Sequence, residues 1–307
     1  MKNEKILITG GAGFLGTHLI KKLLKNGFTN IIVVDKAKPS IEKIEYVYGD
    51  FVDEKIMKPL LKKCDALFHL AAIIGVDNCR DNPELVTKIN FVNTKKLIDL
   101  SAELQVKRIL FTSSSEVYGN SKNIPYREES KLEPISLYGK AKVEIENYLL
   151  KTQKATHITV GIVRPFNVYG PGQRAAFVVP IFIERALHNK PLIIFGNGMQ
   201  TRTFTYVEDV TEGILRLYRY DKTPYEIINV GSKEEYSIKK LAEMILEVLP
   251  RSTSKIEYKE YGTDGVRGRD LEITRRVPSV EKAKKILSFE AKTTLSEGIR
   301  EIIKQSN

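Results

Sequence analysis

The chain has 307 residues, of which 42% are hydrophobic and 28% are charged, a balance that is ordinary for a globular protein. This length is sufficient for one large α/β domain, or for a nucleotide-binding domain with a smaller lobe. No apolar run approaches the roughly 20 residues of a membrane helix, and the N-terminal segment lacks the apolar core of a signal peptide. We therefore expect a cytoplasmic protein without a membrane partner.

The chain is basic, since 49 Lys and Arg against 38 Asp and Glu give a formal net charge of +11. The lysines alternate with glutamates along helix-like segments, and the sequence has no long basic block and no aromatic-basic ribbon. We therefore expect no nucleic-acid partner. An anionic small substrate, attracted to a positive cleft, explains the sign of the charge equally well.

Strand-like apolar runs alternate with amphipathic helical segments from the start of the chain. The strand-like runs lie at residues 5–10, 30–35, 66–72, 108–114 and 158–165, and the helical segments at residues 13–27, 90–104 and 136–152. Such alternation is typical of a parallel sheet that is covered by helices on both faces. The sequence predicts an α/β fold with a doubly wound parallel sheet of the Rossmann type.

After Pro165 the pattern loosens into loops rich in glycine and proline, short helices and one later strand-like run. We expect residues 1–165 to form a dinucleotide-binding domain that also includes return segments near 204–232. Residues 166–307 are expected to form mainly a smaller substrate-binding lobe.

The first strand-like run ends in a glycine-rich loop, "ITGGAGFLG", at residues 8–16. The loop has the spacing Gly-x-Gly-x-x-Gly from Gly11 and Gly-x-x-Gly-x-x-Gly from Gly10, both through Gly13 and Gly16. Glycines permit a tight turn and close approach of a pyrophosphate, and the helix that begins here offers free N–H groups. The predicted cofactor contacts are Gly10, Gly13, Phe14, Leu15 and Gly16.

Asp35 ends the second strand-like run, about 20 residues after the loop, where a carboxylate binds the ribose hydroxyls of a dinucleotide. The same carboxylate repels a 2′-phosphate, so the sequence favours NAD over NADP, although Lys36 and Lys38 lie close by. Asp50 is a further candidate contact, at the adenine edge, with an ordinary loop residue as the alternative.

Tyr138 and Lys142 are four residues apart and therefore share one face of a predicted helix. A neighbouring ammonium and the positive charge of an oxidised nicotinamide stabilise a phenolate, so we expect the pKa of Tyr138 to lie below its usual value near ~10. Tyr138 then acts as a general base for a hydroxyl proton while hydride leaves the same carbon. Before this pair, residues 111–119 ("FTSSSEVYG") place three serines and Glu116 at the end of a strand.

These motifs together resemble those of a known superfamily, the extended short-chain dehydrogenases/reductases. The motifs that carry the resemblance are "TGGAGFLG", "HLAA", "SSSEVYG", "YGKAK" and "RPFNVYGPGQR". More narrowly, the chain is similar to the NAD-dependent nucleotide-sugar epimerases, dehydratases and decarboxylases. The resemblance implies NAD as the cofactor and a nucleotide-diphosphate sugar, with a UDP-sugar favoured, as the substrate.

The resemblance assigns roles to the residues that match the motifs. Ser114 matches the hydroxyl that hydrogen-bonds the sugar oxygen and Tyr138 matches the general base. Lys142 matches the residue that lowers the pKa of this base and holds the nicotinamide ribose. Ala71, in "HLAA", matches a cofactor contact.

The substrate side is assigned in the same way. Asn167 lies in the substrate-contacting turn "FNVYGP", and Arg202 and Arg269 match arginines that bind the nucleotide diphosphate. The planar guanidinium suits this role because it binds phosphate oxygens bidentately. Arg276, in "ITRR", stands where UDP-galactose epimerases carry an aromatic gate to the sugar pocket.

Glu116 and Arg174 bear on the reaction. An epimerase needs little beyond Tyr138 and Ser114, whereas a dehydratase also needs an acid and a base near C5 and C6. The triplet Ser114-Ser115-Glu116 keeps the glutamate of the dTDP-glucose dehydratase triplet but replaces its aspartate, and decarboxylases carry similar triplets. We treat Glu116 as a candidate catalytic residue, with a turn cap as the alternative. Arg174, in "GPGQR", matches an arginine that holds the carboxylate in glucuronate-handling relatives, with diphosphate or solvent contact as the alternative.

We predict an NAD-dependent nucleotide-sugar 4-epimerase that acts on UDP-glucose/UDP-galactose or on N-acetyl or uronic-acid analogues through a transient 4-keto intermediate. The alternatives are a UDP-glucuronate decarboxylase or a nucleotide-sugar 4,6-dehydratase. A non-catalytic dinucleotide-sensing protein is disfavoured because the Tyr-Lys pair is intact.

The sequence also bears on metals and assembly. No metal site is expected, because the four histidines are scattered along the chain. Relatives pair through helices that match residues 90–104 and 136–151, so the resemblance implies a homodimer. The apolar residues of these helices serve either the core or the interface; they include Leu97, Leu100, Ile145 and Leu149.

Overall fold

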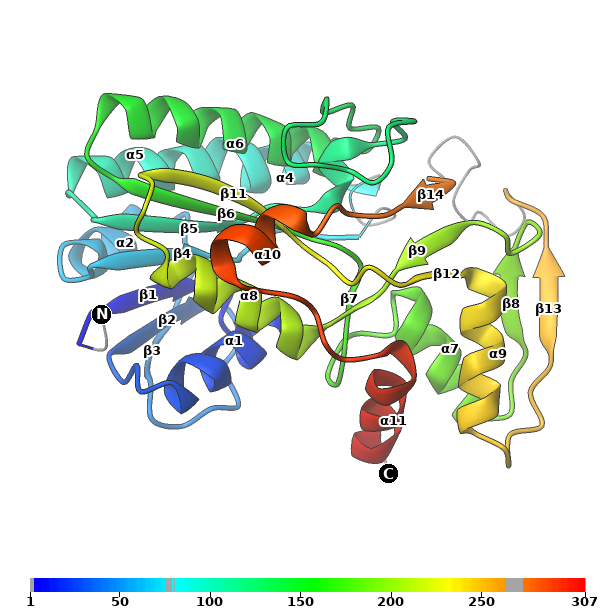
Figure 1. Ribbon diagram of the computed structural model, residues 1–307. Coiled ribbons are helices and arrows are strands. Elements are labelled where there is room, and N and C mark those ends of the chain that lie inside the picture. The colour runs from blue at the N-terminus through cyan, green and yellow to red at the C-terminus, as the bar shows by residue number, and fades with distance from the viewer. Residues whose placement is uncertain (1–2, 76–78, 80, 263–272, 307) are drawn as a thin grey trace.

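The computed structural model describes residues 3–75, 79, 81–262 and 273–306 (Figure 1). A seven-stranded parallel sheet has the strand order β11-β6-β5-β4-β1-β2-β3. Its strands are β1 (Ile6–Thr9), β2 (Ile31–Asp35), β3 (Glu45–Tyr48), β4 (Ala66–His69), β5 (Arg108–Thr112), β6 (Thr159–Pro165) and β11 (Tyr225–Val230). The strand order reverses between β1 and β4, the position at which doubly wound sheets bind ligands at their carboxyl edge. The predicted Rossmann-type fold is confirmed.

Helices cover both faces of this sheet (Figure 1). One face packs against α1 (Phe14–Lys25), α8 (Val207–Arg219) and α10 (Glu281–Leu287), and the other against α2 (Glu54–Leu61), α5 (Thr94–Glu103) and α6 (Leu137–Ala155). Successive residues of a strand point to opposite faces: Ile6 and Ile8 pack with the first set of helices and Leu7 with the second.

The helix predicted at residues 90–104 is not uniform. The short helix α4 (Pro83–Val86) leads into a π-helix (Thr87–Asn93), and only then does α5 begin. The four apolar residues proposed for core or interface in α5 and α6 are at most 9% exposed and belong to the core under the sheet. No helix of the described residues is long and apolar enough to cross a membrane.

The C-terminal segments gather at one end of the sheet (Figure 1). They form α7 (Val178–Leu187), α9 (Ile238–Val248) and α11 (Leu295–Ser306), together with β7 (Val168–Tyr169), β8 (Leu192–Phe195), β9 (Thr201–Thr203), β10 (Thr205–Tyr206), β12 (Glu235–Ser237), β13 (Ile256–Lys259) and β14 (Arg275–Arg276). The strands form small sheets, in which β9 lies between β12 and β14 and β8 pairs with β13. Phe182, Leu241 and Ile299 join the three helices in one buried cluster.

Candidate active site

The glycine-rich loop joins β1 to α1 at the carboxyl edge of the sheet. Gly10 has a φ of +77°, and a Cβ at this position would lie 2.6 Å from the backbone nitrogen of Ala71. A Cβ at Gly16 would overlap the carbonyl oxygen of Gly10, so α1 can approach the loop only at a glycine. Gly13 caps α1, and a Cβ there would meet one atom, the oxygen of Gly10, at 3.2 Å. The backbone is therefore open to a ligand in front of α1.

Asp35 lies beside this loop at the end of β2. One carboxylate oxygen accepts a hydrogen bond from the N–H of Ala12 in the loop (2.9 Å), and the other accepts one from Ala37 (3.0 Å). Asp50 forms an ion pair with Lys36 at 2.5 Å, so a carboxylate already balances the ammonium that follows Asp35. This corner of the site therefore favours ribose hydroxyls over a 2′-phosphate.

The residues present fit an NAD molecule. The first turn of α1, which includes Phe14 and Leu15, has backbone N–H groups that no carbonyl within the helix can reach. A pyrophosphate accepts hydrogen bonds from such groups, and the fixed carboxylate of Asp35 accepts them from ribose hydroxyls. Ala71 completes the edge of the loop through its close approach to Gly10.

The three serines after β5 have different partners. Ser113 donates a hydrogen bond to the carboxylate of Glu146 in the core. Ser114 caps the 3₁₀-helix that follows, where its hydroxyl accepts the N–H of Glu116 at 3.2 Å. Ser115 is 2% exposed and packs inward. Of the three, Ser114 is the one whose side chain acts on the candidate base, since it lowers the pKa of Tyr138 against the larger effect of burial.

Helix α6 positions Tyr138 and Lys142. Ser136 caps this helix by accepting the N–H of Gly139 at 3.0 Å. The Nζ of Lys142 donates to the carbonyl of Thr112 at the end of β5 (2.7 Å) and lies 5.4 Å from the centre of the Tyr138 ring. The structure therefore brings the predicted Ser, Tyr and Lys together beside the glycine-rich loop.

The pKa values of Tyr138 and Lys142 in the protein without a cofactor bear on our expectation of a phenolate. Burial, followed by the charge of Glu116, raises the pKa of Tyr138, and burial lowers the pKa of Lys142 to about 7. In the protein without a cofactor Lys142 does not offset this effect, because it is buried, partly neutral near pH 7, and directed at the carbonyl of Thr112. The lowering of the Tyr138 pKa expected beside an oxidised nicotinamide stays a prediction.

Glu116 connects the segment after β5 to strand β14 and to the start of α6. One carboxylate oxygen accepts a hydrogen bond from the hydroxyl of Ser136 (3.0 Å), and the other pairs with Nη2 of Arg276 in β14 (2.7 Å). The side chains of Glu116 and Arg276 are 13% and 7% exposed. The Nε of Arg276 is buried and has no hydrogen-bond partner among the described residues. A charged pair from distant parts of the chain therefore lies next to the candidate base.

A second buried pair lies behind the serines. Arg164, in β6, donates from Nε to Glu146 (3.0 Å) and from Nη1 to the hydroxyl of Tyr118 (2.7 Å). The same carboxylate accepts a hydrogen bond from Ser113, and Tyr118 donates to Asn229 in β11 at 2.7 Å. This network fixes the strand ends from which the catalytic candidates project. Our sequence interpretation missed it, although an arginine inside an apolar strand is a usable signal.

The predicted substrate residues lie on the C-terminal side of the site. Asn167 has a φ of +37°, and its side-chain amide donates to the carbonyl of Thr203 at 2.8 Å. Arg202 is 8% exposed and its strand pairs with that of Arg276, whereas Arg174 is exposed. Arg269 lies outside the described residues.

Within the part of the chain that the structure describes, histidines and other potential metal ligands do not cluster. Across residues 3–75, 79, 81–262 and 273–306, no group of three or more His, Cys, Asp or Glu side chains could hold a metal ion. His69 lies in the core, where burial lowers its pKa to about 3, and its ring contacts Thr9 and Thr94 at 2.7 and 3.1 Å.

Comparisons with known proteins place this geometry in a family. Residues 6–231 match the family model described as "NAD dependent epimerase/dehydratase family". A UDP-N-acetyl-alpha-D-glucosaminuronate decarboxylase of Bacillus cytotoxicus is 34% identical, over 98% of this chain and 97% of that protein.

Solved structures of UDP-sugar 4-epimerases are also similar to this chain. UDP-glucose 4-epimerase of Thermotoga maritima with UDP-glucose has a TM-score of 0.89 and 30% identity, covering 98% of this chain and 97% of the other. UDP-glucuronic acid 4-epimerase of Bacillus cereus, in complex with UDP-glucuronic acid and NAD, has a TM-score of 0.88 and 28% identity, covering 99% and 100%. The similarity therefore extends to epimerases and to decarboxylases, and the family's dependence on NAD confirms the predicted cofactor. The chain belongs to the NAD-dependent epimerase/dehydratase family of enzymes.

Proposed function

We propose that the protein is an NAD-dependent 4-epimerase of UDP-sugars. The observation that carries the proposal is the placement of Lys142 5.4 Å from the Tyr138 ring and at the end of β5, where Ser114 follows, at the same carboxyl edge of the sheet as the glycine-rich loop. When bound, NAD supplies a reversible hydride acceptor. Tyr138 takes the proton of the sugar 4-hydroxyl and later returns it, and Ser114 donates a hydrogen bond to the same oxygen. Turning of the 4-keto sugar between these two steps inverts C4.

The raised pKa of Tyr138 implies that cofactor binding precedes proton transfer. Alone, the protein holds Tyr138 as a phenol, which cannot accept a proton. A positive charge beside the ring favours the phenolate, and both the oxidised cofactor and a protonated Lys142 provide one. Proton transfer from the sugar therefore depends on prior binding of the cofactor.

The substrate assignments follow the same proposal. Residues 1–165, with return segments near 204–232, form the cofactor lobe, and residues 166–307 form mainly the sugar-nucleotide lobe. Asn167 contacts the sugar nucleotide and Arg202 binds its diphosphate. Arg174 binds the diphosphate or a sugar carboxylate, and Arg269 binds the diphosphate. These four residues bind the substrate for the catalytic residues Ser114, Tyr138 and Lys142.

A specific observation favours a second candidate, decarboxylation of a UDP-hexuronate. A sugar carboxylate near Glu116 needs a compensating cation. Arg276 provides it, because its guanidinium already contacts Glu116 and retains one buried N–H without an acceptor. Oxidation at C4 of a uronate gives a β-keto acid, which loses CO₂ and takes up a proton at C5.

Product analysis separates the two candidates. The NAD-loaded protein is incubated with UDP-glucose, UDP-N-acetylglucosamine, UDP-glucuronate, dTDP-glucose and GDP-mannose. We expect C4 epimers of a UDP-sugar, no net NADH and no CO₂. Glu116→Gln reduces the rate only modestly in this case, because epimerisation uses no proton of Glu116. A UDP-pentose from UDP-glucuronate, or a 4-keto-6-deoxy sugar, overturns the epimerase proposal.

We also propose that the protein is a homodimer. Leu85 and Val92 are 48% and 40% exposed, and they lie on the segment that leads into α5 and packs beside α6. Apolar residues at these positions suit a helical interface. Light scattering at micromolar concentration should give twice the chain mass, and a monomer would contradict the proposal.

A further inference from the structure

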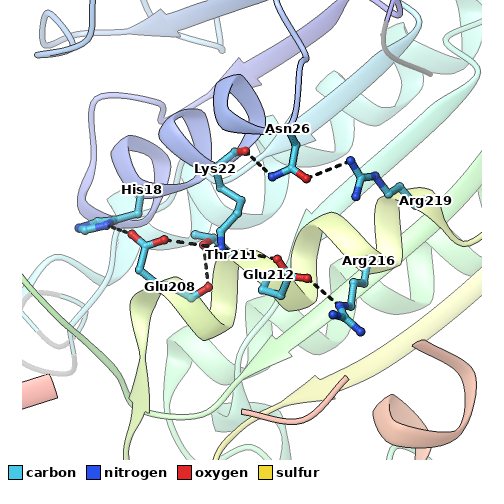
Figure 2. A network of polar contacts seen from close by, with 8 residues as sticks. All are labelled: His18, Lys22, Asn26, Glu208, Thr211, Glu212, Arg216 and Arg219. Atoms are coloured by element: carbon cyan, nitrogen blue, oxygen red, sulfur yellow. Dashed lines mark hydrogen bonds and ion pairs between the residues drawn. The ribbon is translucent and has the colours of Figure 1, made fainter. Parts of the chain in front are cut away.

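His18 lies on α1, one turn after the cofactor loop, and contacts two other parts of the chain. Its side chain is 12% exposed, and its ring packs edge-on against Phe14 with the centroids 5.4 Å apart. The Nδ1 atom lies 2.8 Å from a carboxylate oxygen of Glu208 in α8, a contact that Figure 2 shows. The Nε2 atom lies 2.9 Å from the carbonyl oxygen of Pro171. No residue of the mechanism above uses this histidine.

Both neighbours of the His18 ring are acceptors. The carbonyl of Pro171 can only accept, so Nε2 carries a proton. Glu208 is ionised at neutral pH, because the hydrogen bond from His18, followed by the nearby charge of His18, holds the pKa of this carboxyl below its ordinary value despite burial. Both ring nitrogens of His18 therefore face acceptors, and the ring links α1 to α8 and to the carbonyl of Pro171 at once.

The carbonyl of Pro171 belongs to the turn that carries Arg174. Gly170, which precedes Pro171, packs between the same two helices: a Cβ there would lie 2.5 Å from Val207 in α8 and 3.5 Å from Phe14 in α1. Gly172 has a φ of +80° and open space around it. One end of the turn is therefore fixed by His18 and by packing, and the other end, with Arg174, is exposed.

Other charged groups surround the contact of His18 with Glu208. Lys22, one turn further along α1, lies 3.8 Å from Glu208 and 3.5 Å from Glu212, and Glu212 pairs with Arg216 at 2.7 Å (Figure 2). Lys21 also lowers the pKa of Glu208. The Lys22 pairs join α1 to α8 without touching the turn, so they supply an internal control for the role of His18.

We propose that His18 is a positioning residue that holds the turn of residues 170–174 against α1 for binding of the sugar nucleotide. The proposal rests on the proposed function only in assigning Arg174 to that ligand. Without the His18 ring, Pro171 and Glu208 lose the contacts that this ring makes from α1. The turn is then less restrained, and binding of the sugar nucleotide weakens.

Three variants separate positioning of the turn from helix packing. His18→Phe keeps a ring against Phe14 but removes both donors, and His18→Gln keeps one donor. Glu212→Gln is the matched control, because it weakens the same α1–α8 junction at Lys22 and Arg216 and leaves His18 in place.

Hydrogen exchange of residues 170–176 tests the structural part without any ligand. After correction for intrinsic rates, exchange in His18→Phe should rise about tenfold at pH 6, about the effect of one charge-assisted hydrogen bond. His18→Gln should show a smaller rise and Glu212→Gln none. Unchanged exchange in His18→Phe, or an equal rise in Glu212→Gln, overturns the proposal.

Titration calorimetry tests the binding part. The Kd of UDP for the NAD-loaded His18→Phe protein should rise about tenfold, while the Kd of NAD for the free protein changes less than twofold. With a substrate, the same change should raise KM and leave kcat within about twofold. Faster exchange with an unchanged Kd for UDP overturns the role in binding but leaves the epimerase proposal intact. Failure of wild type to bind UDP overturns the proposed function while the exchange data still decide the role of His18 in the turn.

Discussion

Replacing Arg164 by methionine should lower the free energy of unfolding by about 3–5 kcal/mol, the usual cost of removing one partner of a buried ion pair. The side chains of Arg164 and Glu146 are 2% and 3% exposed. The change removes two bonds to Glu146 and the donors to the hydroxyl of Tyr118 and to the carbonyl of Glu128 (2.7 and 2.9 Å). Glu146 would then remain buried, with Ser113 as a donor and no cation bonded to it.

Urea denaturation followed by circular dichroism measures this loss. The double variant Arg164→Met/Glu146→Leu removes both charges and should recover at least half of the loss, because no uncompensated charge then remains in the core. Lys131→Met breaks an exposed pair with Glu133 and should leave the midpoint unchanged. A loss below about 1 kcal/mol in Arg164→Met, or a double variant as unstable as the single one, would refute the reasoning.

Three other changes test the site. Tyr138→Phe should keep the fold and NAD binding and lose turnover by several orders of magnitude in a product assay; near-normal turnover would contradict the mechanism. Lys142→Met should raise the melting temperature of the cofactor-free protein while abolishing turnover. Because the pKa of Lys142 falls from 10.5 unfolded to about 7 folded, the unfolded chain binds more protons between these values and wild-type stability rises with pH there. The rise in melting temperature caused by Lys142→Met should therefore be larger at pH 7 than at pH 10. An equal rise at both pH values would be inconsistent with a buried amine. Asp35→Ala should narrow the preference for NAD over NADP in titration calorimetry, and a wild type that prefers NADP would show the ribose assignment to be wrong.

Local patterns predicted the parts of the site that lie close together in the sequence. The glycine-rich loop is one turn between a strand and a helix, and Tyr138 and Lys142 are neighbours on one helix, so spacing alone relates them. The serine segment follows a strand whose carboxyl end is at the same sheet edge, which places Ser114 beside them.

Long-range contacts could not be predicted in this way. The ion pair between Glu116 and Arg276 depends on where the pairing of β14 with β9 places Arg276. The direction in which the pKa of Tyr138 shifts depends on its burial in the complete fold. The π-helix is a similar case. Its residue Asn90 donates to the carbonyl of Ile73 and accepts from the N–H of the same residue, both at 2.8 Å, a tertiary contact that hydrophobic periodicity does not encode.

The late strand β11 has a consequence for how the protein is made. Residues 225–230 pair with residues 160–165 of β6, of which Ile162 and Val163 are fully buried. The sheet therefore gains its last strand only after most of the chain has been synthesised. Until then β6 presents an unpaired apolar edge, which is prone to pair with other chains. A fragment that ends at Pro165 should therefore aggregate, and the ribosome must release about three quarters of the chain before the cofactor fold can close.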